Sequence, residues 1–248
     1  MIIDAHAHLG HDYVFDEDSN EQELLEYYRQ FGIAGAIVQP FINRPYLEDT
    51  REIHDRIHAF CKKAGRYFWG MASINPHFRP ADYEKEAERC VRKLGYVALK
   101  ITPIAHAAHP ANEDCRFVYE VAGKLKVPVM IHTGMGIPFA DPASLLEVVG
   151  DFKDVKFVIA HAGSDMFFQQ ALYLARHFDN VYLEPSWINI MNIRKALETV
   201  GPTKLMFSSD QAINAPVELV KYRTLIQDPQ QLERVLSGTA IEVFNLQV

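Results

Sequence analysis

Two histidines one residue apart stand at the end of a short β-rich run, Ile2-Ile3-Asp4-Ala5-His6-Ala7-His8. Because the side chains of a strand alternate between its two faces, His6 and His8 point to the same side. Two neutral imidazoles at one strand end supply half of a metal site. Such a pair also arises by accident, so its meaning depends on what recurs later in the chain.

Residues that bind metals or move protons also follow later apolar runs. The expected strand ends carry Lys100, His132, His161, Glu184 and Asp210. Singly, each has a structural explanation: a histidine at a strand–loop junction is often hydrogen-bonded in place, and an aspartate there can cap a turn. Independent accidents would not gather all of them at the same end of one fold. The joint pattern therefore indicates a functional site.

The elements that must position these residues alternate between strands and helices. Strands are expected at residues 2–8, 36–38, 67–74, 97–101, 128–132, 155–159, 181–183 and 204–207. Helices are expected at 21–31, 49–64, 81–94, 112–126, 142–152, 165–178 and 189–200, with two more within 216–246, and residues 10–20 form an acidic loop. Strands that are apolar on both faces are typical of a parallel sheet. Eight such units in 248 residues predict an α/β fold, a single-domain (β/α)₈ TIM barrel over residues 1–248.

Composition narrows the function classes. The formal net charge of −7 argues against binding to a phosphate backbone. No apolar run approaches the length of a membrane span and no secretory leader precedes the first strand, so we expect a cytoplasmic protein without a nucleic-acid or membrane partner. A homodimer is the default expectation for assembly. Cys61, Cys90 and Cys115 fall in expected helices without Cys-X-X-Cys spacing, which predicts buried free thiols.

Six motifs spread over nearly the whole chain share the pattern of one known family: AHAHLG, GYVALKITP, PVMIHTG, VKFVIAHAG, KLMFSSDQ and LSGTAIEVFNL. Through these motifs the chain resembles the amidohydrolase superfamily, and within it the compact amidohydrolase 2 branch that also holds the amino-carboxymuconate-semialdehyde decarboxylase-like enzymes. The family usually has Gly-Ser-Asp and Asn-Ala where this chain has Ser208-Ser209-Asp210 and Thr239-Ala240, which weakens the subfamily assignment more than the metal assignment.

The resemblance implies that His6, His8, His132 and Asp210 bind one divalent metal, zinc or manganese. Three imidazoles and a carboxylate suit such a cation, and a metal lowers the pKa of a bound water toward neutrality. Asp210 would then take the proton of that water, and His161 would polarise the scissile group or shuttle a proton.

Lys100 leaves several alternatives open. In binuclear relatives a lysine at this strand end is carboxylated and bridges two metals, and His161 would then bind the second metal. A bare ammonium would instead bind an anionic substrate, or pair with Glu184 or Asp210. We favour anion binding or pairing over carboxylation.

Further candidates lie near the expected mouth of the barrel. Glu184 would orient a ligand histidine, and Arg44, in the loop after the second strand, would bind a substrate carboxylate. Trp187 is a candidate wall of the pocket, although we favour a buried aromatic. His54 and His58 have helical i, i+4 spacing but no third ligand nearby in the sequence, which predicts a solvated helix face.

The expected function is hydrolysis of an amide, lactone or ester of a small substrate by a metal-activated water. The alternative is a metal-dependent decarboxylase acting on a small carboxylic acid. Decarboxylase members of the family tend to grip carboxylates with arginines near the first strand. Here the residues after His8 are acidic, which favours hydrolysis: Asp12, Asp16, Glu17 and Asp18. A non-catalytic metal-binding barrel is the least favoured hypothesis.

Overall fold

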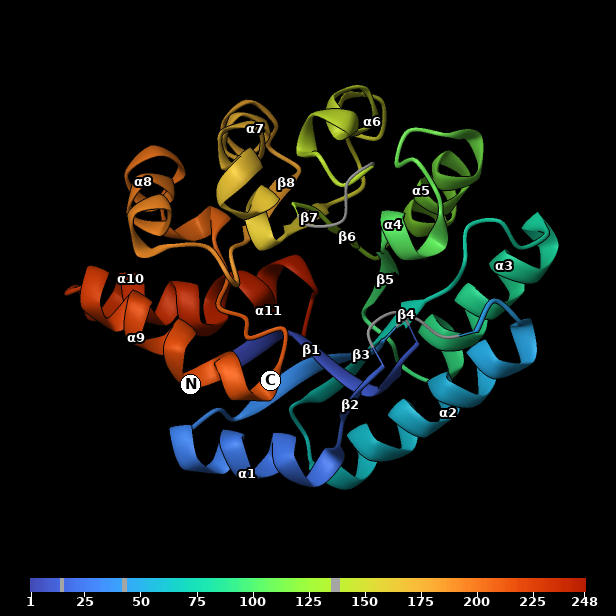
Figure 1. Ribbon diagram of the computed structural model, residues 1–248, viewed down its shortest axis with the longest axis horizontal. Coiled ribbons are helices and arrows are strands. Elements are labelled where there is room, and N and C mark those ends of the chain that lie inside the picture. The colour runs from blue at the N-terminus through green and yellow to red at the C-terminus, as the bar shows by residue number, and fades with distance from the viewer. Residues whose placement is uncertain (14–15, 42–43, 135–138) are drawn as a thin grey trace.

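A curled sheet forms the centre of the computed structural model, which describes residues 1–13, 16–41, 44–134 and 139–248. Its strands follow the order β2-β1-β3-β4-β5-β6-β7-β8, and helices surround its outer face (Figure 1). From β1 to β8 every neighbouring pair is parallel, while β2 pairs antiparallel with β1. The strands are β1 (Ile3–Asp12), β2 (Glu17–Ser19), β3 (Gly35–Pro40), β4 (Phe68–Ser73), β5 (Ala98–Ile101), β6 (Val129–His132), β7 (Phe157–Ala160) and β8 (Val181–Glu184).

Most helices match the expected ranges to within a few residues, but the short helix Pro103–His106 was not expected. The first begins after Asn20, whose side chain accepts a hydrogen bond from the backbone of Glu23, and ends at the left-handed Gly32, which has no Cβ to oppose that turn. The expected helix at 81–94 finishes as a π-helix, η1 (Arg89–Lys93). The α-helices are α1 (Glu21–Phe31), α2 (Leu47–Ala64), α3 (Pro80–Glu88), α4 (Pro103–His106), α5 (Glu113–Leu125), α6 (Leu146–Asp151), α7 (Ser164–His177), α8 (Ile190–Val200), α9 (Ala215–Leu225), α10 (Pro229–Glu233) and α11 (Thr239–Val243).

Apolar side chains pack on both faces of the sheet. The larger cluster lies between the strands and the surrounding helices. A smaller cluster fills the concave side, and it includes Ile3, Ile37, Met71, Met130 and Val158 together with residues of α11. Burial on both faces explains why the strands lack polar alternation. The concave side is therefore a packed interior, and polar side chains on that side must gather at the strand ends.

The expected strand at 204–207 is not a regular strand. The backbone N–H of Met206 donates to Leu183 of β8, whereas the carbonyl of Phe207 accepts from Ala5 of β1. Isolated bridges link Leu205 to Leu183 and Asp210 to Ala7. Because the N–H of Phe207 turns instead to the carbonyl of Val235, the ladder is interrupted. The segment 205–210 thus joins the last and first strands without forming a continuous ladder with either.

The expected loop at 10–20 is partly ordered as strand. β1 continues to Asp12 and pairs with β2, so the prediction of an irregular segment is wrong for the described part of this range; residues 14–15 lie outside it. His11 lies 3.2 and 3.1 Å from carboxylate oxygens of Asp16 and Asp18, whose side chains are largely exposed. These carboxylates therefore face solvent.

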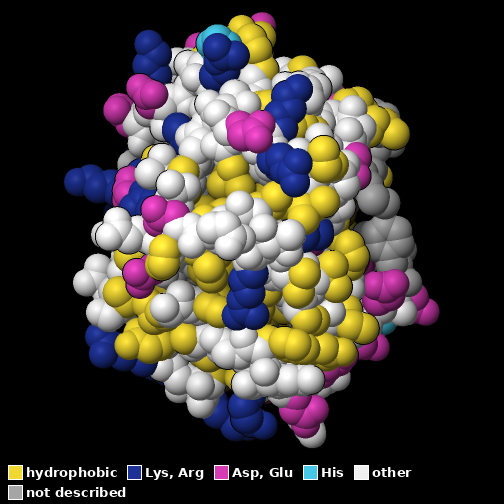
Figure 2. All heavy atoms as spheres, turned by 90° about the vertical axis from the view of Figure 1, so that its left-hand side faces the viewer, with side chains coloured by type: hydrophobic (Ala, Val, Ile, Leu, Met, Phe, Trp, Pro, Cys, Tyr) yellow, Lys and Arg dark blue, Asp and Glu magenta, His cyan; other side chains and the backbone are white. Residues whose placement is uncertain are grey.

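None of the described helices is long and apolar enough to cross a membrane. The three cysteines are free and buried, as predicted. Figure 2 shows apolar side chains on the side of the molecule where α8 and α9 lie. On these helices and just before α9, several apolar side chains are more than half exposed: Met191, Ile213, Val217 and Val220.

Candidate metal centre

His6 and His8 point into the same site, and the hydrogen bonds of their Nδ1 atoms select the tautomer that each neutral ring adopts. Nδ1 of His6 donates to Glu184 at 2.8 Å, and Nδ1 of His8 donates to the backbone carbonyl of Pro40 at 3.1 Å. Burial, followed by the nearby ammonium of Lys100, lowers the pKa of His6 to about 3, so this ring is neutral. The two Nε2 atoms lie 3.0 Å apart. Both are acceptors in these tautomers, so they cannot satisfy each other.

Asp210 adds a third acceptor. Its Oδ1 lies 3.2 Å from Nε2 of His6 and 3.4 Å from Nε2 of His8. Burial would raise the pKa of Asp210, but its interactions with His161, His6 and His8 outweigh burial and hold this pKa well below its ordinary value. Ligand atoms about 2.0–2.1 Å from a common ion lie roughly 3–3.4 Å from one another. The three atoms therefore fit a divalent cation in spacing and chemistry, and His6, His8 and Asp210 form a group able to hold one.

Two donors flank the imidazole lone pairs. Nζ of Lys100 lies 3.1 Å from Nε2 of His6, and Nε2 of Gln39 lies 3.1 Å from Nε2 of His8. Burial lowers the pKa of Lys100 to about 8, while Asp210 and Glu184 oppose this effect, so the ammonium form dominates at neutral pH. Gln39 was missed by the sequence analysis, although a glutamine in the otherwise apolar run Ala36–Pro40 is a visible signal.

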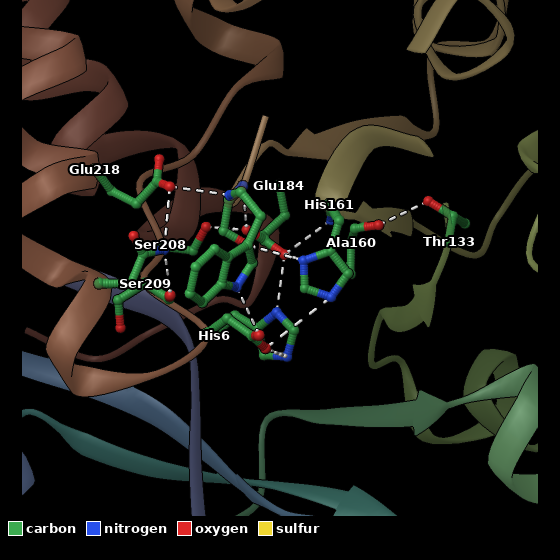
Figure 3. Close-up of polar contacts among 12 residues, drawn as sticks. His6, Thr133, Ala160, His161, Glu184, Ser208, Ser209 and Glu218 are labelled. Carbon is green, nitrogen blue, oxygen red and sulfur yellow. Dashed lines mark hydrogen bonds and ion pairs between the residues drawn. The ribbon is translucent and has the colours of Figure 1, made fainter. Parts of the chain in front are cut away.

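Glu184 links His6 to the segments that carry His161, Ser186 and Ser208 (Figure 3). Its Oε2 accepts from His6 and from the backbone N–H of His161 at 3.1 Å, and its Oε1 accepts from the backbone of Ser186 at 2.9 Å and from the hydroxyl of Ser208. Burial would raise the pKa of Glu184, but its interactions with His6 and His161 lower it to about 2. The carboxylate stays ionised and keeps Nδ1 of His6 protonated, which turns the Nε2 lone pair into the site.

The ring of His161 lies next to the rings of His6 and His132. The His161 ring is 5.3 Å from His6 and 4.9 Å from His132, which it meets edge to face. Nδ1 of His161 is hydrogen-bonded to the hydroxyl of Ser186 at 2.8 Å. Thr133 donates to Ala160 and accepts from the backbone of Gly163, so it ties the ends of β6 and β7 together (Figure 3). Binding of a metal by His132 remains a prediction.

Three residues of the site adopt left-handed backbone conformations. The φ angles are +60° at His161, +67° at Trp187 and +66° at Asp210, and such conformations cost about 1–3 kcal/mol each. The backbone N–H of each residue has a fixed acceptor: Glu184, Glu218 and the carbonyl of His6, respectively. The surrounding hydrogen bonds therefore hold this strained geometry, which is common at functional sites.

Trp187 is half exposed, so the expectation of a buried aromatic is wrong and it lies at the site instead. Its indole Nε1 donates to Oδ2 of Asp210 at 2.8 Å. This bond leaves Oδ1 of Asp210 directed at the two imidazoles. Trp187 thus contacts Asp210 and orients its carboxylate, while its role as a wall of a substrate pocket remains a prediction.

Asp4 is a second residue that the sequence analysis missed. Its carboxylate accepts from the backbone of His6 at 3.1 Å, from the backbone of Ser209 at 2.9 Å and from the hydroxyl of Tyr28 at 2.7 Å. Burial raises the pKa of Asp4 to about 7. These bonds join β1 to the segment that carries Asp210, and a buried acidic residue in an apolar strand is the signal that could have found it.

The guanidinium of Arg44 lies over the ring of Tyr13 at 5.0 Å, and its binding of a substrate carboxylate remains a prediction. The expectation for His54 and His58 turns out differently. His54 is fully buried, so the prediction of a solvated helix face is wrong. Its Nδ1 donates to Glu86 at 2.8 Å and its Nε2 accepts from the backbone of Ser73. Glu86 comes from the next helix, and the spacing within α2 could not reveal it.

The fold and the group formed by His6, His8 and Asp210 define an α/β protein whose parallel sheet carries, at the carboxyl ends of its strands, residues able to hold a metal ion. The chain belongs to the amidohydrolase family: the Amidohydro_2 family model, described as Amidohydrolase, matches residues 3–246. This confirms the resemblance seen in the sequence. No curated protein matches the chain.

Solved structures share the fold over nearly the full chain. A 2,6-dihydroxybenzoate decarboxylase complexed with 2,6-dihydroxybenzoate is 14% identical, with a TM-score of 0.80 and coverage of 99% of this chain and 98% of that chain. A dihydroxybenzoic acid decarboxylase from Polaromonas sp., with bound manganese and 2-nitroresorcinol, is 16% identical, with a TM-score of 0.79 and coverage of 99% and 97%. A 4-oxalomesaconate hydratase from Rhodopseudomonas palustris is 18% identical, with a TM-score of 0.72 and coverage of 99% and 96%. At these identities the likeness concerns the fold alone.

Proposed function

We propose that this protein is a metal-dependent decarboxylase that acts on a small carboxylic acid. The observation that carries the proposal is the buried ammonium of Lys100, 3.1 Å from Nε2 of His6 and beside the three-acceptor cluster. A fixed positive charge at this position suits a substrate that carries a carboxylate. The decarboxylases among the structures of the same fold add support.

The proposed ligands of the cation are His6, His8, His132 and Asp210. Imidazole and carboxylate donors suit zinc or manganese, and we propose one ion. Such a cation would supply positive charge that binds the carboxylate and stabilises the electron pair left on the substrate. The ammonium of Lys100 opposes a second cation beside His6, so we rank carboxylation of Lys100 below its role in anion binding.

The residues of the chain divide the remaining tasks. Lys100 binds the carboxylate of the substrate. When the bond between that carboxyl carbon and the rest of the molecule breaks, carbon dioxide leaves and the electron pair stays on the neighbouring carbon. His161 delivers a proton from Nε2 to that carbon, and Ser186 holds the imidazole in place through Nδ1. The products are carbon dioxide and the protonated remainder, and one proton from solvent restores His161.

Hydrolysis, the function first expected, loses its main argument. It rested on the acidic residues after His8. Asp16, Glu17 and Asp18 have exposed side chains, so they do not repel an anion inside the site, whereas Asp12 is buried on β1. We retain a homodimer and a small-molecule substrate as predictions.

We further propose that the segment 205–210 closes the sheet into a (β/α)₈ barrel as its eighth member. The backbone hydrogen bonds of this segment to β8 and to β1 support closure. Closure would place Asp210 opposite the ends of β5 and β6 and bring all proposed ligands to one mouth.

The test combines metal analysis with product analysis. Purified protein should hold about one divalent ion per chain and release carbon dioxide from members of a panel of hydroxybenzoic and muconate-type acids. His161→Ala should keep the metal and lose turnover, whereas His177→Ala, at the end of α7, should retain both. Hydrolysis of an ester or lactone panel without carbon dioxide release would refute the proposal.

A further inference from the structure

Gln39 is a buried polar residue whose hydrogen bonds are incomplete. It lies on β3 two positions after Ile37, so it points to the concave side where Ile37 packs. Its side chain is fully buried, and its Oε1 has no hydrogen-bond partner among the described residues. An unpaired buried oxygen is destabilising, so a glutamine kept here only for packing would be a poor choice.

The neighbouring histidine decides which way the amide faces. In the neutral ring, which is the form that binds a metal, donation from Nδ1 of His8 to the carbonyl of Pro40 leaves Nε2 as an acceptor. Nε2 of Gln39 is the donor that meets it, at 3.1 Å. The reversed amide would place two acceptors against each other. The unpaired Oε1 therefore faces away from the ring of His8.

The hydrogen bond from Gln39 uses the lone pair that a cation would need. Nε2 of His8 is also 3.0 Å from Nε2 of His6 and 3.4 Å from Oδ1 of Asp210. A cation held by these atoms would take the lone pair of His8. The amide of Gln39 would then lose its one described partner while it stays buried beside the site.

We propose that Gln39 changes partner when the site binds its cation: it releases His8 and presents its amide to the substrate. The inference rests on the proposed cation at His8 and goes beyond it. Gln39 would compete with the cation for the Nε2 lone pair of His8, and after its release it would bind the substrate. An amide both donates and accepts, so it matches an uncharged hydroxyl group. Lys100, at the other side of the histidine pair, matches the anionic group.

The experiment compares Gln39→Met with the wild-type protein. Methionine has a similar volume but removes both polar atoms, and Ile37→Met is the matched control on the same face of β3. Calorimetric titration with Mn²⁺ should show about two- to tenfold tighter binding to Gln39→Met, because the competing hydrogen bond is gone, and unchanged binding to Ile37→Met. In the Mn²⁺-loaded protein, salicylate should bind more tightly than benzoate, and Gln39→Met should reduce this preference by about fivefold or more.

The outcomes separate this inference from the proposed function. Unchanged or weaker Mn²⁺ binding by Gln39→Met, relative to Ile37→Met, would show that Gln39 only supports His8 and would overturn the proposal. Equal affinity of the loaded wild-type protein for salicylate and benzoate would overturn the substrate role. A wild-type protein that binds no Mn²⁺ defeats both this inference and the proposed function. Tighter Mn²⁺ binding by the variant, without carbon dioxide release by the wild type, defeats the proposed function alone.

Discussion

Replacing Asp210 by asparagine should convert the cation site into a closed hydrogen-bond network. Oδ2 of Asp210 accepts from the indole of Trp187 at 2.8 Å, and Oδ1 faces the Nε2 atoms of His6 and His8. The asparagine oxygen must stay on the indole, which can only donate. The amide nitrogen then faces the two imidazole lone pairs and donates to them. We therefore expect the variant to fold but to lose the cation.

The expected free-energy changes differ between the metal-free variant and the metal-bound wild type. Two new amide hydrogen bonds contribute about 0.5–1.5 kcal/mol each to the metal-free variant. The lost attraction between Asp210 and the buried ammonium of Lys100 offsets a similar amount. The metal-free variant should thus lie within about 1 kcal/mol of the wild type. A cation at 100 times its Kd should stabilise the wild type by about 2.7 kcal/mol, which raises Tm by roughly 5–10 °C for a chain of this size.

Differential scanning calorimetry with and without Mn²⁺ measures both quantities. The Tm of Asp210→Asn should not change when Mn²⁺ is added. Glu147→Gln, which removes an exposed charge elsewhere, should respond as the wild type does. The reasoning fails if Mn²⁺ raises the Tm of Asp210→Asn as much as that of the wild type, or if the metal-free variant is several kcal/mol less stable.

Two further predictions concern Trp187, which contacts Asp210, and Glu86, which pairs with His54. Trp187→Phe removes the donor to Asp210 and should weaken Mn²⁺ binding about tenfold in calorimetric titration. The free energy of unfolding should stay within about 0.5 kcal/mol of that of the wild type. Unchanged Mn²⁺ affinity would contradict an orienting role of Trp187. Burial would raise the pKa of Glu86, but hydrogen bonds from His54 and Arg89 outweigh burial and lower this pKa from 4.5 to about 2. The ionised carboxylate therefore stabilises the fold by about 3 kcal/mol above pH 4.5. This contribution is lost as the pH falls from 4.5 to 2. In urea unfolding, Glu86→Gln should be less stable than wild type at neutral pH, and a gap that does not narrow toward pH 2 would refute the assignment.

Most of the strands and helices, and several residues of the site, could be predicted from local patterns along the chain. Apolar runs of β-branched residues and helical spacing are local signals, so strands and helices could be predicted to within a few residues. The i, i+2 spacing of His6 and His8 placed both rings on one face before any fold was known. The prediction of a regular strand at 204–207 was wrong for a nonlocal reason, because the backbone of this segment pairs with β8, β1 and Val235 in turn.

The pairing of the polar side chains depends on contacts between segments that are far apart in the sequence. The carbonyl of Pro40 fixes the tautomer of His8, and this in turn orients the amide of Gln39. Glu184 fixes His6 in the same way from a strand 178 positions away in the sequence. Hydrogen bonds between distant segments leave no periodic trace along the chain. The residue types could therefore suggest a metal site, whereas the facing lone pairs of His6, His8 and Asp210 follow only from the folded backbone.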